Sequence, residues 1–193
     1  MTPVTGLFFG SFNPFHEGHL AIARYLLARR VCREVWFVVS PLNPFKGEAG
    51  LLPADLRLDI ARTAVARQPH LVVSDAELDM PLPSYTANTL EHLAGVHRRR
   101  RFGLVIGADN YRDFRRWWRA DEIIQRFPLI VYPRPGAPIP YPLDPPAIVV
   151  DAPLLPVSSS LVREKIARGE DVSALVPPAA LPLIMKYYAP PET

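Results

Sequence analysis

The chain has 193 residues, of which 49% are hydrophobic and 21% charged, and its formal net charge is +3. This composition is typical of one globular domain, and the charge is too small to indicate a nucleic-acid surface. No apolar run reaches the roughly 18 residues of a membrane helix, and the single cysteine, Cys32, excludes an internal disulfide. We therefore expect a cytoplasmic protein that binds small anionic ligands and has no membrane or nucleic-acid partner. The oligomeric state stays open.

Six short apolar runs predict β-strands, and helical patterns separate most of them. The runs are residues 4–9, 34–39, 71–76, 101–106, 128–132 and 147–150. Near-continuous apolar runs are typical of parallel strands that are covered on both faces. Apolar residues recur at helical spacing in residues 17–30, 53–68, 84–99 and 159–170. This alternation predicts an α/β fold with a doubly wound parallel sheet, in which ligands bind beyond the carboxyl ends of the strands.

Proline is frequent, and nine of the 23 prolines lie in residues 133–156. Such a segment cannot form a regular helix or a central strand. We interpret it as a long connection with one short strand, rather than as a linker between two domains. One domain then spans residues 1–193, with a C-terminal helical part, about residues 158–190, packed on the sheet.

The stretch GSFNPFHEGH, Gly10 to His19, leads from the first strand into a helix that is expected to begin near Glu17 or Gly18. The free N–H groups and the positive dipole end of such a helix suit a phosphate. His16 and His19 are spaced so that both can face one ligand. We favour phosphate binding. A two-histidine metal site would need a third ligand, which only Glu17 offers nearby, and a buried structural histidine is the other alternative.

The stretch VSSSLVREKI, residues 157–166, begins another helix with three serines and places Arg163 about one turn inside it. The serine hydroxyls and the N–H groups could bind phosphate. Alternatively, one serine caps the helix and Arg163 lies in solvent. Capping is a sufficient explanation of this stretch alone, but both helix starts would open onto the same edge of the sheet.

Two further turns carry candidate binding groups. In GADNYRDFRRWW, residues 107–118, Asp109 could bind a ribose hydroxyl or a metal-bound water, and the two tryptophans could stack on a ligand or lie in the core. In PSYTANTL, residues 83–90, Ser84 or Thr86 is expected to cap a helix, and the same amides could contact a ligand. The basic run at residues 97–101 is interpreted as a solvated helix end.

These stretches resemble a known family. GSFNPFHEGH resembles the G-x-F-x-P-x-H-x-G-H signature of the nucleotidylyltransferase superfamily, and VSSSLVR resembles its second signature, (I/V)-S-S-(T/S)-x-x-R. PSYTANTL, GADNYRDFRRWW, YPRPG and GEDVSALVPPAALPLIMKYY are similar to the bacterial nicotinate-nucleotide adenylyltransferases of that superfamily. The resemblance implies a Rossmann-like fold and an enzyme of NAD biosynthesis. Its substrates would be ATP, with Mg²⁺, and nicotinate mononucleotide, and its products deamido-NAD and pyrophosphate.

The resemblance also assigns roles to residues. The catalytic residues would be His16, His19 and Arg163, with no metal ligand from the protein. The residues expected to bind ATP are Gly10, Ser11, Phe12, Gly18, Gly107, Asp109, Ser158 and Ser159. Those expected to bind nicotinate mononucleotide are Lys46, Thr86, Trp117, Trp118 and Arg134. Trp117 would stack on the pyridine ring, and amides near Thr86 and Trp118 would receive its carboxylate.

The sequence departs from the family pattern at two positions. Asn13 stands where many relatives have aspartate, and Phe45 stands where a histidine often precedes the residue equivalent to Lys46. The alternatives are an adenylyltransferase that acts on nicotinamide mononucleotide or phosphopantetheine, a non-catalytic nucleotide-binding module, and a metal-dependent hydrolase that uses the two histidines.

Overall fold

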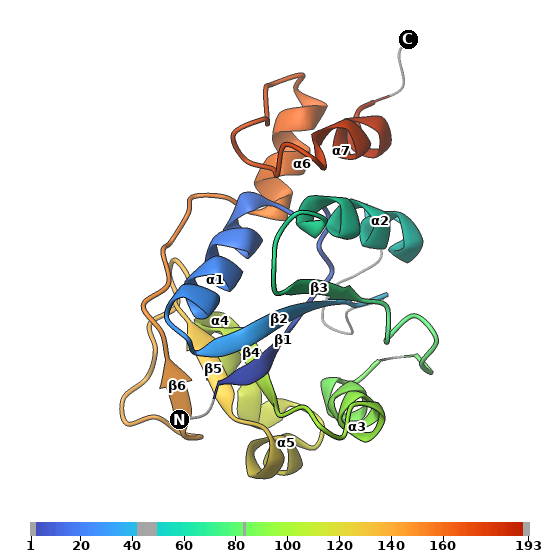
Figure 1. Ribbon diagram of the computed structural model, residues 1–193. Helices are drawn as coiled ribbons and strands as arrows, with labels where there is room; N and C mark the ends of the chain where they lie inside the picture. Colours follow the sequence, from blue (N-terminus) through green and yellow to red (C-terminus); the bar gives the residue numbers. More distant parts are fainter. Residues whose placement is uncertain (1–2, 42–49, 83, 191–193) are drawn as a thin grey trace.

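The computed structural model describes residues 3–41, 50–82 and 84–190, and its centre is a six-stranded parallel sheet (Figure 1). The strands are β1 (Val4–Gly10), β2 (Cys32–Val39), β3 (Leu71–Ser74), β4 (Phe102–Gly107), β5 (Leu129–Tyr132) and β6 (Ala147–Val149). Their order is β3-β2-β1-β4-β5-β6, and neighbouring strands pair in parallel. The predicted doubly wound α/β fold is confirmed.

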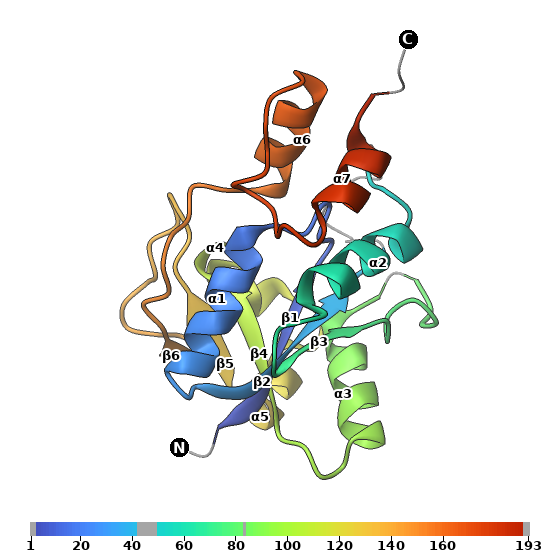
Figure 2. The ribbon, with the colours of Figure 1, turned by 45° about the horizontal axis from the view of Figure 1, so that its top comes forward.

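The helices form two layers, one on each face of the sheet. They are α1 (Glu17–Ala28), α2 (Ala54–Val65), α3 (Thr86–Val96), α4 (Ala108–Arg112), the 3-10 helix η1 (Phe114–Arg116), α5 (Ala120–Arg126), α6 (Ser159–Ala167) and α7 (Leu181–Tyr188). Figures 1 and 2 show α1 and α2 on one face of the sheet and α3 and α5 on the other. In both views α6 and α7 lie beyond α1 and α2, at the same side of the molecule.

Alternate residues of the central strands face the two helical layers. In β1, Phe8 belongs to the buried cluster of α1 and α2, whereas Leu7 belongs to the cluster of α3 and α5. A strand that is covered on both faces needs apolar residues at every position, which explains the continuous runs in the sequence. Val162 of α6 and Ile184 of α7 belong to the same buried cluster as Phe8. The boundaries of the single domain stay a prediction.

The predicted strands and helices are all present, with ends that differ by up to three residues. Gly169, at φ 70°, follows the end of α6 in the left-handed conformation expected of a glycine at a helix C-terminus. The sequence did not predict α4, η1 or α5, because these elements are too short to show a helical period. None of the helices in the described ranges is long and apolar enough to cross a membrane.

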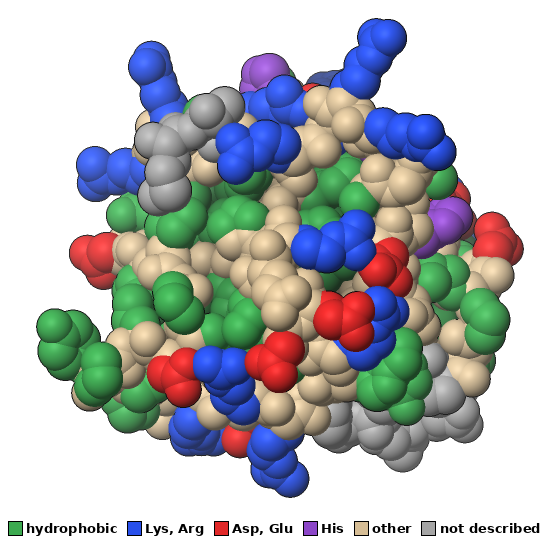
Figure 3. Space-filling model, turned by 90° about the horizontal axis from the view of Figure 1, so that it is seen from below, with side chains coloured by type: hydrophobic (Ala, Val, Ile, Leu, Met, Phe, Trp, Pro, Cys, Tyr) green, Lys and Arg blue, Asp and Glu red, His purple; other side chains and the backbone are tan. Residues whose placement is uncertain are grey.

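Side chains of both charges are spread over the face that carries α3 and α5 (Figure 3). One residue of the basic run, Arg100, contributes to the fold. Its guanidinium lies 5.1 Å from the centre of the Trp36 ring and forms an ion pair with Glu34. At least this arginine is therefore engaged with the protein itself.

Candidate active site

Helix α1 begins at Glu17, directly after the loop that follows β1, as predicted. The N–H of His16 donates to Nδ1 of His19 (3.1 Å), and the N–H of His19 donates to the carbonyl of His16 (3.0 Å). The two imidazole rings stack with their centres 3.6 Å apart. The Glu17 carboxylate lies 3.4 Å from Arg24, so it is directed to an arginine of its own helix rather than to the histidines. The pairing of the two rings is therefore built into the first turn.

These hydrogen bonds determine which nitrogens can donate. Because Nδ1 of His19 accepts a hydrogen bond, the network assigns the proton of a neutral His19 ring to Nε2. Burial, and then the charge of Arg134, lower the pKa of His16 to about 3, so its ring is neutral at pH 7. Nδ1 of His16 is buried and has no hydrogen-bond partner within the described part of the chain. A polar ligand would supply that partner and remove the cost of leaving it unpaired.

Helix α6 lies against the loop that precedes α1. The Ser158 side chain caps α6, which confirms the capping interpretation for this serine. The Ser159 hydroxyl donates to the carbonyl of Pro14 (2.9 Å), and Nη1 of Arg163 donates to the carbonyl of Asn13 (2.6 Å). The alternative that Arg163 lies in solvent is therefore wrong. Two stretches that are about 150 residues apart in sequence meet at one loop.

The Asn13 side chain uses both ends of its amide. Its Nδ2 donates to the carbonyl of Gly50 (2.9 Å), while its Oδ1 accepts from the N–H of Leu52 (3.1 Å) and from the hydroxyl of Tyr188 (2.5 Å). An aspartate could accept the last two bonds but could not donate to Gly50 when ionised. This geometry gives a physical reason for asparagine at the first departure from the family pattern.

Two glycines allow a close approach of backbone and side chains in this loop. A Cβ atom on Gly18 would lie 3.0 Å from the His16 ring and 3.0 Å from Val157, so the starts of α1 and α6 touch there. A Cβ atom on Gly10 would lie 2.9 Å from the ring of Phe12. Phe12 itself has φ 47°, a left-handed conformation that costs a non-glycine residue free energy and is held here by burial of its ring.

The end of β4 brings Gly107 and Asp109 beside Arg134. Strands β1 and β4 are neighbours where the strand order reverses, which is where doubly wound sheets bind ligands. A Cβ atom on Gly107 would lie 2.4 Å from Oδ1 of Asp109 and 2.9 Å from Cγ of Arg134. Oδ1 is buried and accepts no hydrogen bond from the described residues; Nε of Arg134 is 3.6 Å away. Arg134 therefore lies near His16 and Asp109, on the predicted ATP side.

The start of α3 differs from its prediction. The N-cap of α3 is Tyr85, and no side chain caps the helix, so the expectation that Ser84 or Thr86 does so is wrong. The Ser84 hydroxyl instead donates to the buried carboxylate of Glu77 (3.0 Å), which leaves it unable to serve as the cap. Thr86 is the first residue of the helix, where N–H groups have no partner inside the helix.

The two tryptophans have different surroundings. Trp117 is half-buried and packs on Phe114, with ring centres 5.2 Å apart. Trp118 is 47% exposed and lies against Tyr85, with ring centres 4.9 Å apart. The Tyr85–Trp118 contact joins the start of α3 to the tryptophan segment, so the structure brings these predicted acceptor residues together.

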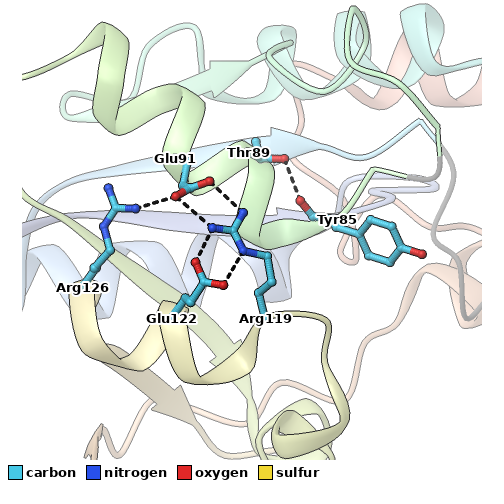
Figure 4. A network of polar contacts seen from close by, with 6 residues as sticks. All are labelled: Tyr85, Thr89, Glu91, Arg119, Glu122 and Arg126. Carbon is cyan, nitrogen blue, oxygen red and sulfur yellow. Dashed lines mark hydrogen bonds and ion pairs between the residues drawn. The ribbon is translucent and has the colours of Figure 1, made fainter.

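An ion-pair network holds the tryptophan segment to α3 (Figure 4). Arg119 donates to both oxygens of Glu91 (2.8 and 3.2 Å), pairs with Glu122, and lies 5.1 Å from the centre of the Trp118 ring. Arg126 of α5 donates to the same Glu91 (2.6 Å). This network was not predictable from the sequence, because it depends on how α3 and α5 lie side by side.

Lys46, and Phe45 beside it, lie outside the described residues. Within residues 3–41, 50–82 and 84–190, no group of three histidine, cysteine, aspartate or glutamate side chains could hold a metal ion. The described residues thus give no support to the two-histidine metal site.

The chain is similar to known proteins over most of its length. Residues 7–165 match the cytidylyltransferase-like family. A "probable nicotinate-nucleotide adenylyltransferase" of Bacteroides fragilis is 43% identical over 183 residues, which cover 94% of this chain and 91% of that protein. The protein of the same name in Porphyromonas gingivalis is 41% identical over 176 residues, with coverage of 90% and 89%. The fold is similar to that of Plasmodium falciparum nicotinic acid mononucleotide adenylyltransferase complexed with NaAD, with a TM-score of 0.78, 18% identity and 96% of each chain covered.

Proposed function

Since this chain belongs to the cytidylyltransferase-like family and, within it, to the nicotinate-nucleotide adenylyltransferases, we propose that it joins ATP and nicotinate mononucleotide to form deamido-NAD and pyrophosphate. The observation that best supports this reaction is the contact between two helix starts. Arg163 and Ser159 of α6 bind the carbonyls of Asn13 and Pro14 in the loop before α1. Two helix N-termini at one loop suit a polyphosphate, because each directs N–H groups and a positive dipole end toward it.

In the proposed step, an oxygen of the mononucleotide 5′-phosphate attacks the α-phosphorus of ATP in line. A new phosphorus–oxygen bond forms while the bond from the α-phosphorus to the bridging oxygen breaks. Pyrophosphate leaves with that electron pair. No protein nucleophile takes part, so the protein has to align two anions and stabilise the charge of the transition state.

His19 is proposed to act at the reacting phosphate. Its Nε2–H would donate to an oxygen of the α-phosphate, where negative charge crowds in the transition state. Neutral His16 would present its buried Nδ1 to the same nucleotide. The Ser158 and Ser159 hydroxyls are already engaged, so we assign their backbone N–H groups, with Arg163, to the β- and γ-phosphates that leave.

The remaining assignments concern the nucleotide loop and the acceptor. Gly10, Ser11, Phe12 and Gly18 would line ATP along the loop before α1. Trp117 would stack on the pyridine ring, and amides near Thr86 and Trp118 would bind its carboxylate. Arg134, beside Asp109, would reach the phosphates between the two substrates. The role of Lys46 and a cytoplasmic location stay proposals of the same kind.

A divalent cation, Mg²⁺ in this proposal, would arrive with the triphosphate. The buried Oδ1 of Asp109, which accepts no hydrogen bond from the described residues, is a suitable oxygen ligand, either directly or through water. Mg²⁺ commonly takes one or two carboxylates together with substrate phosphates, so a single aspartate fits this chemistry. When bound, the cation neutralises phosphate charge.

An acceptor assay tests the proposal. The purified chain would be supplied with ATP, Mg²⁺ and one acceptor at a time: nicotinate mononucleotide, nicotinamide mononucleotide or phosphopantetheine. We expect pyrophosphate release with the highest kcat/KM for the nicotinate form, and mass spectrometry should identify deamido-NAD. Faster reaction of the amide would overturn the substrate assignment. ATP binding without turnover on any acceptor would indicate a nucleotide-binding module instead, and ATP cleavage without an acceptor would indicate a hydrolase.

A further inference from the structure

Two buried charged side chains, Arg57 and Glu77, have no part in the reaction described above. Arg57 is fully buried, and Glu77 is 1% exposed. Among the described residues, neither of them forms an ion pair. Burying a charge is costly unless its polar atoms find hydrogen-bond partners. The hydrogen-bond partners of these two residues therefore indicate which segments they hold together.

Arg57 binds four backbone carbonyls. Its Nε donates to Leu52 (2.7 Å), its Nη1 to Ser11 (2.5 Å) and Ser40 (2.8 Å), and its Nη2 to Pro41 (2.9 Å). Ser11 belongs to the loop proposed to bind ATP, Ser40 and Pro41 follow β2, and Leu52 precedes α2. One guanidinium thus holds three separate segments in a fixed arrangement.

Glu77 binds side chains at the start of α3, where the acceptor is proposed to bind. Its carboxylate accepts from the hydroxyls of Ser84 (3.0 Å) and Thr89 (2.8 Å), which lie on either side of Thr86 at the start of α3. Burial raises the pKa of Glu77, and the nearby hydroxyls of Ser40, Thr89 and Ser84 oppose that rise. Ser40 lies beside both buried charges, because its carbonyl accepts from Arg57 and its side chain is close enough to Glu77 to lower the pKa of that carboxyl.

We propose that Arg57 and Glu77 are positioning residues that hold the ATP loop in register with the start of α3, with Ser40 between them. This inference rests on the proposed function, because a transfer between two bound substrates requires both binding segments at a fixed separation. A displacement of about 1 Å can cost about 100-fold in rate. Apolar side chains of similar size would fill the same space without desolvating a charge, so burial alone does not explain this pair.

Variants of each residue make distinct predictions. Arg57→Lys keeps the charge but has its donors on one atom, so it cannot reach four carbonyls. We expect kcat to fall by about 10-fold or more and the KM for ATP to rise more than the KM for the acceptor. Glu77→Ala should raise the KM for the acceptor more, and Glu77→Gln, which keeps the shape and an acceptor oxygen, should restore most of the loss. In the double variant of Arg57→Lys and Glu77→Ala, the losses in kcat should be non-additive.

Val65→Ala is the matched control, because Val65 is buried on the same helix as Arg57 but at its other end. It should lower the Tm and leave kcat unchanged below that temperature. If Arg57→Lys keeps wild-type kcat and KM values, or loses no more activity than Val65→Ala at an equal loss of Tm, the positioning role is wrong.

Hydrogen exchange tests the inference without turnover, so that its failure and that of the proposed function stay distinct. If the wild-type chain transfers to no acceptor, the proposed function fails while this measurement still applies. Arg57→Lys should speed exchange of the amides in residues 10–16, Glu77→Ala those in residues 84–90, and Val65→Ala neither. Unchanged exchange in both segments would refute the positioning role.

Discussion

The candidate site has two ends that are built in different ways. The phosphate end consists of the loop before α1 and the starts of α1 and α6, and the acceptor end consists of the start of α3 and the segment with Trp117 and Trp118. At the phosphate end, side chains bind the backbone of distant segments: Arg163 binds the carbonyl of Asn13, 150 positions away. His16 is buried there and is neutral. At the acceptor end, Tyr85 and Trp118 are 37% and 47% exposed, and Arg119, which forms surface ion pairs with Glu91 and Glu122, lies over the Trp118 ring. The phosphate end thus has a buried histidine, whereas Tyr85 and Trp118 of the acceptor end are exposed, and the start of α3 is held from inside, by Glu77.

This difference suits the chemistry proposed for each end. The triphosphate is the part of the reaction where charge accumulates, and donors that are fixed in advance stabilise it best. The acceptor ring only has to be recognised and oriented, which exposed aromatic side chains can do once the start of α3 is held in place. We therefore expect changes at the phosphate end to lower kcat or stability, and changes at the acceptor end to alter KM.

The largest effect is expected for His19→Ala. Loss of a preorganised donor at the reacting phosphate should lower kcat by at least about 100-fold, whereas the Kd of ATP, measured by calorimetry, should change far less. His92→Ala, an exposed histidine on α3, is the control and should retain kcat. Equal losses in turnover and ATP binding would indicate that the phosphate end only binds.

The second prediction concerns the pH dependence of stability through His16. Its pKa is about 3 in the folded chain and about 6.5 in the unfolded chain. Below pH 6.5 the unfolded chain therefore takes up a proton that the folded ring does not. The contribution of His16 to the stability of the folded chain is therefore fully present above pH 6.5 and is lost as the pH falls toward 3. From this group, the free energy of unfolding should fall by about 2 kcal/mol between pH 6.5 and 5.

Urea denaturation at several pH values measures this effect. Other groups titrate in the same range, so the informative quantity is the difference between the wild type and His16→Gln, which cannot titrate. We expect the stability of the variant to depend less steeply on pH between 5 and 6.5. Parallel curves would show that His16 does not stay neutral in the folded chain. The electrostatic difference between the two ends would then be absent.

The two helix starts of the phosphate end were predictable from the sequence because their signals are local. A strand, a glycine, a proline and the start of a helix follow one another within residues 4–19, and serines mark the start of α6. The contact of Arg163 with Asn13 was not predictable in detail, since a carbonyl 150 residues away leaves no local pattern. The predicted topology, in which both helix starts open onto the same edge of the sheet, and then the family resemblance indicated that the two stretches act together.

The acceptor end was predicted less well because tertiary contacts override its local pattern. Serine is a common N-cap residue, but the hydroxyl of Ser84 donates to a buried carboxylate instead. One readable signal was missed: Arg57 shares the buried face of α2 with Ile60 and Ala64, at helical spacing. A charged residue inside an apolar stripe indicates a buried polar contact, and here it marks the side chain that holds the loops.

Asn13→Asp tests whether the phosphate end depends on internal hydrogen bonds. The ionised side chain cannot donate to Gly50, and its charge would lie next to that carbonyl. Because Gly50 is exposed and water can replace the lost donor, the free energy of unfolding should fall by the net value of one hydrogen bond, about 1 kcal/mol, in urea denaturation. Asn110→Asp, at an exposed position of α4, should have little effect. Equal stability of both variants would mean that the bond to Gly50 does not brace the loop.

The smallest effect is expected for Arg119→Ala at the acceptor end. Surface ion pairs contribute little and are screened by salt, so the KM for the acceptor should rise by less than about fivefold. The increase should shrink when the salt concentration is raised to about 0.5 M. The kcat and the KM for ATP should not change, because Arg119 contacts Glu91, Glu122 and Trp118 rather than the loop before α1.

Arg115→Ala is the control for that variant, since Arg115 pairs with Asp121 and Asp144, away from the Tyr85–Trp118 contact. It should leave the KM for the acceptor unchanged. A loss of kcat in Arg119→Ala as large as that in His19→Ala would contradict the comparison. It would mean that the surface network fixes the reacting groups as strongly as the buried contacts do, and that both ends are preorganised for the transition state.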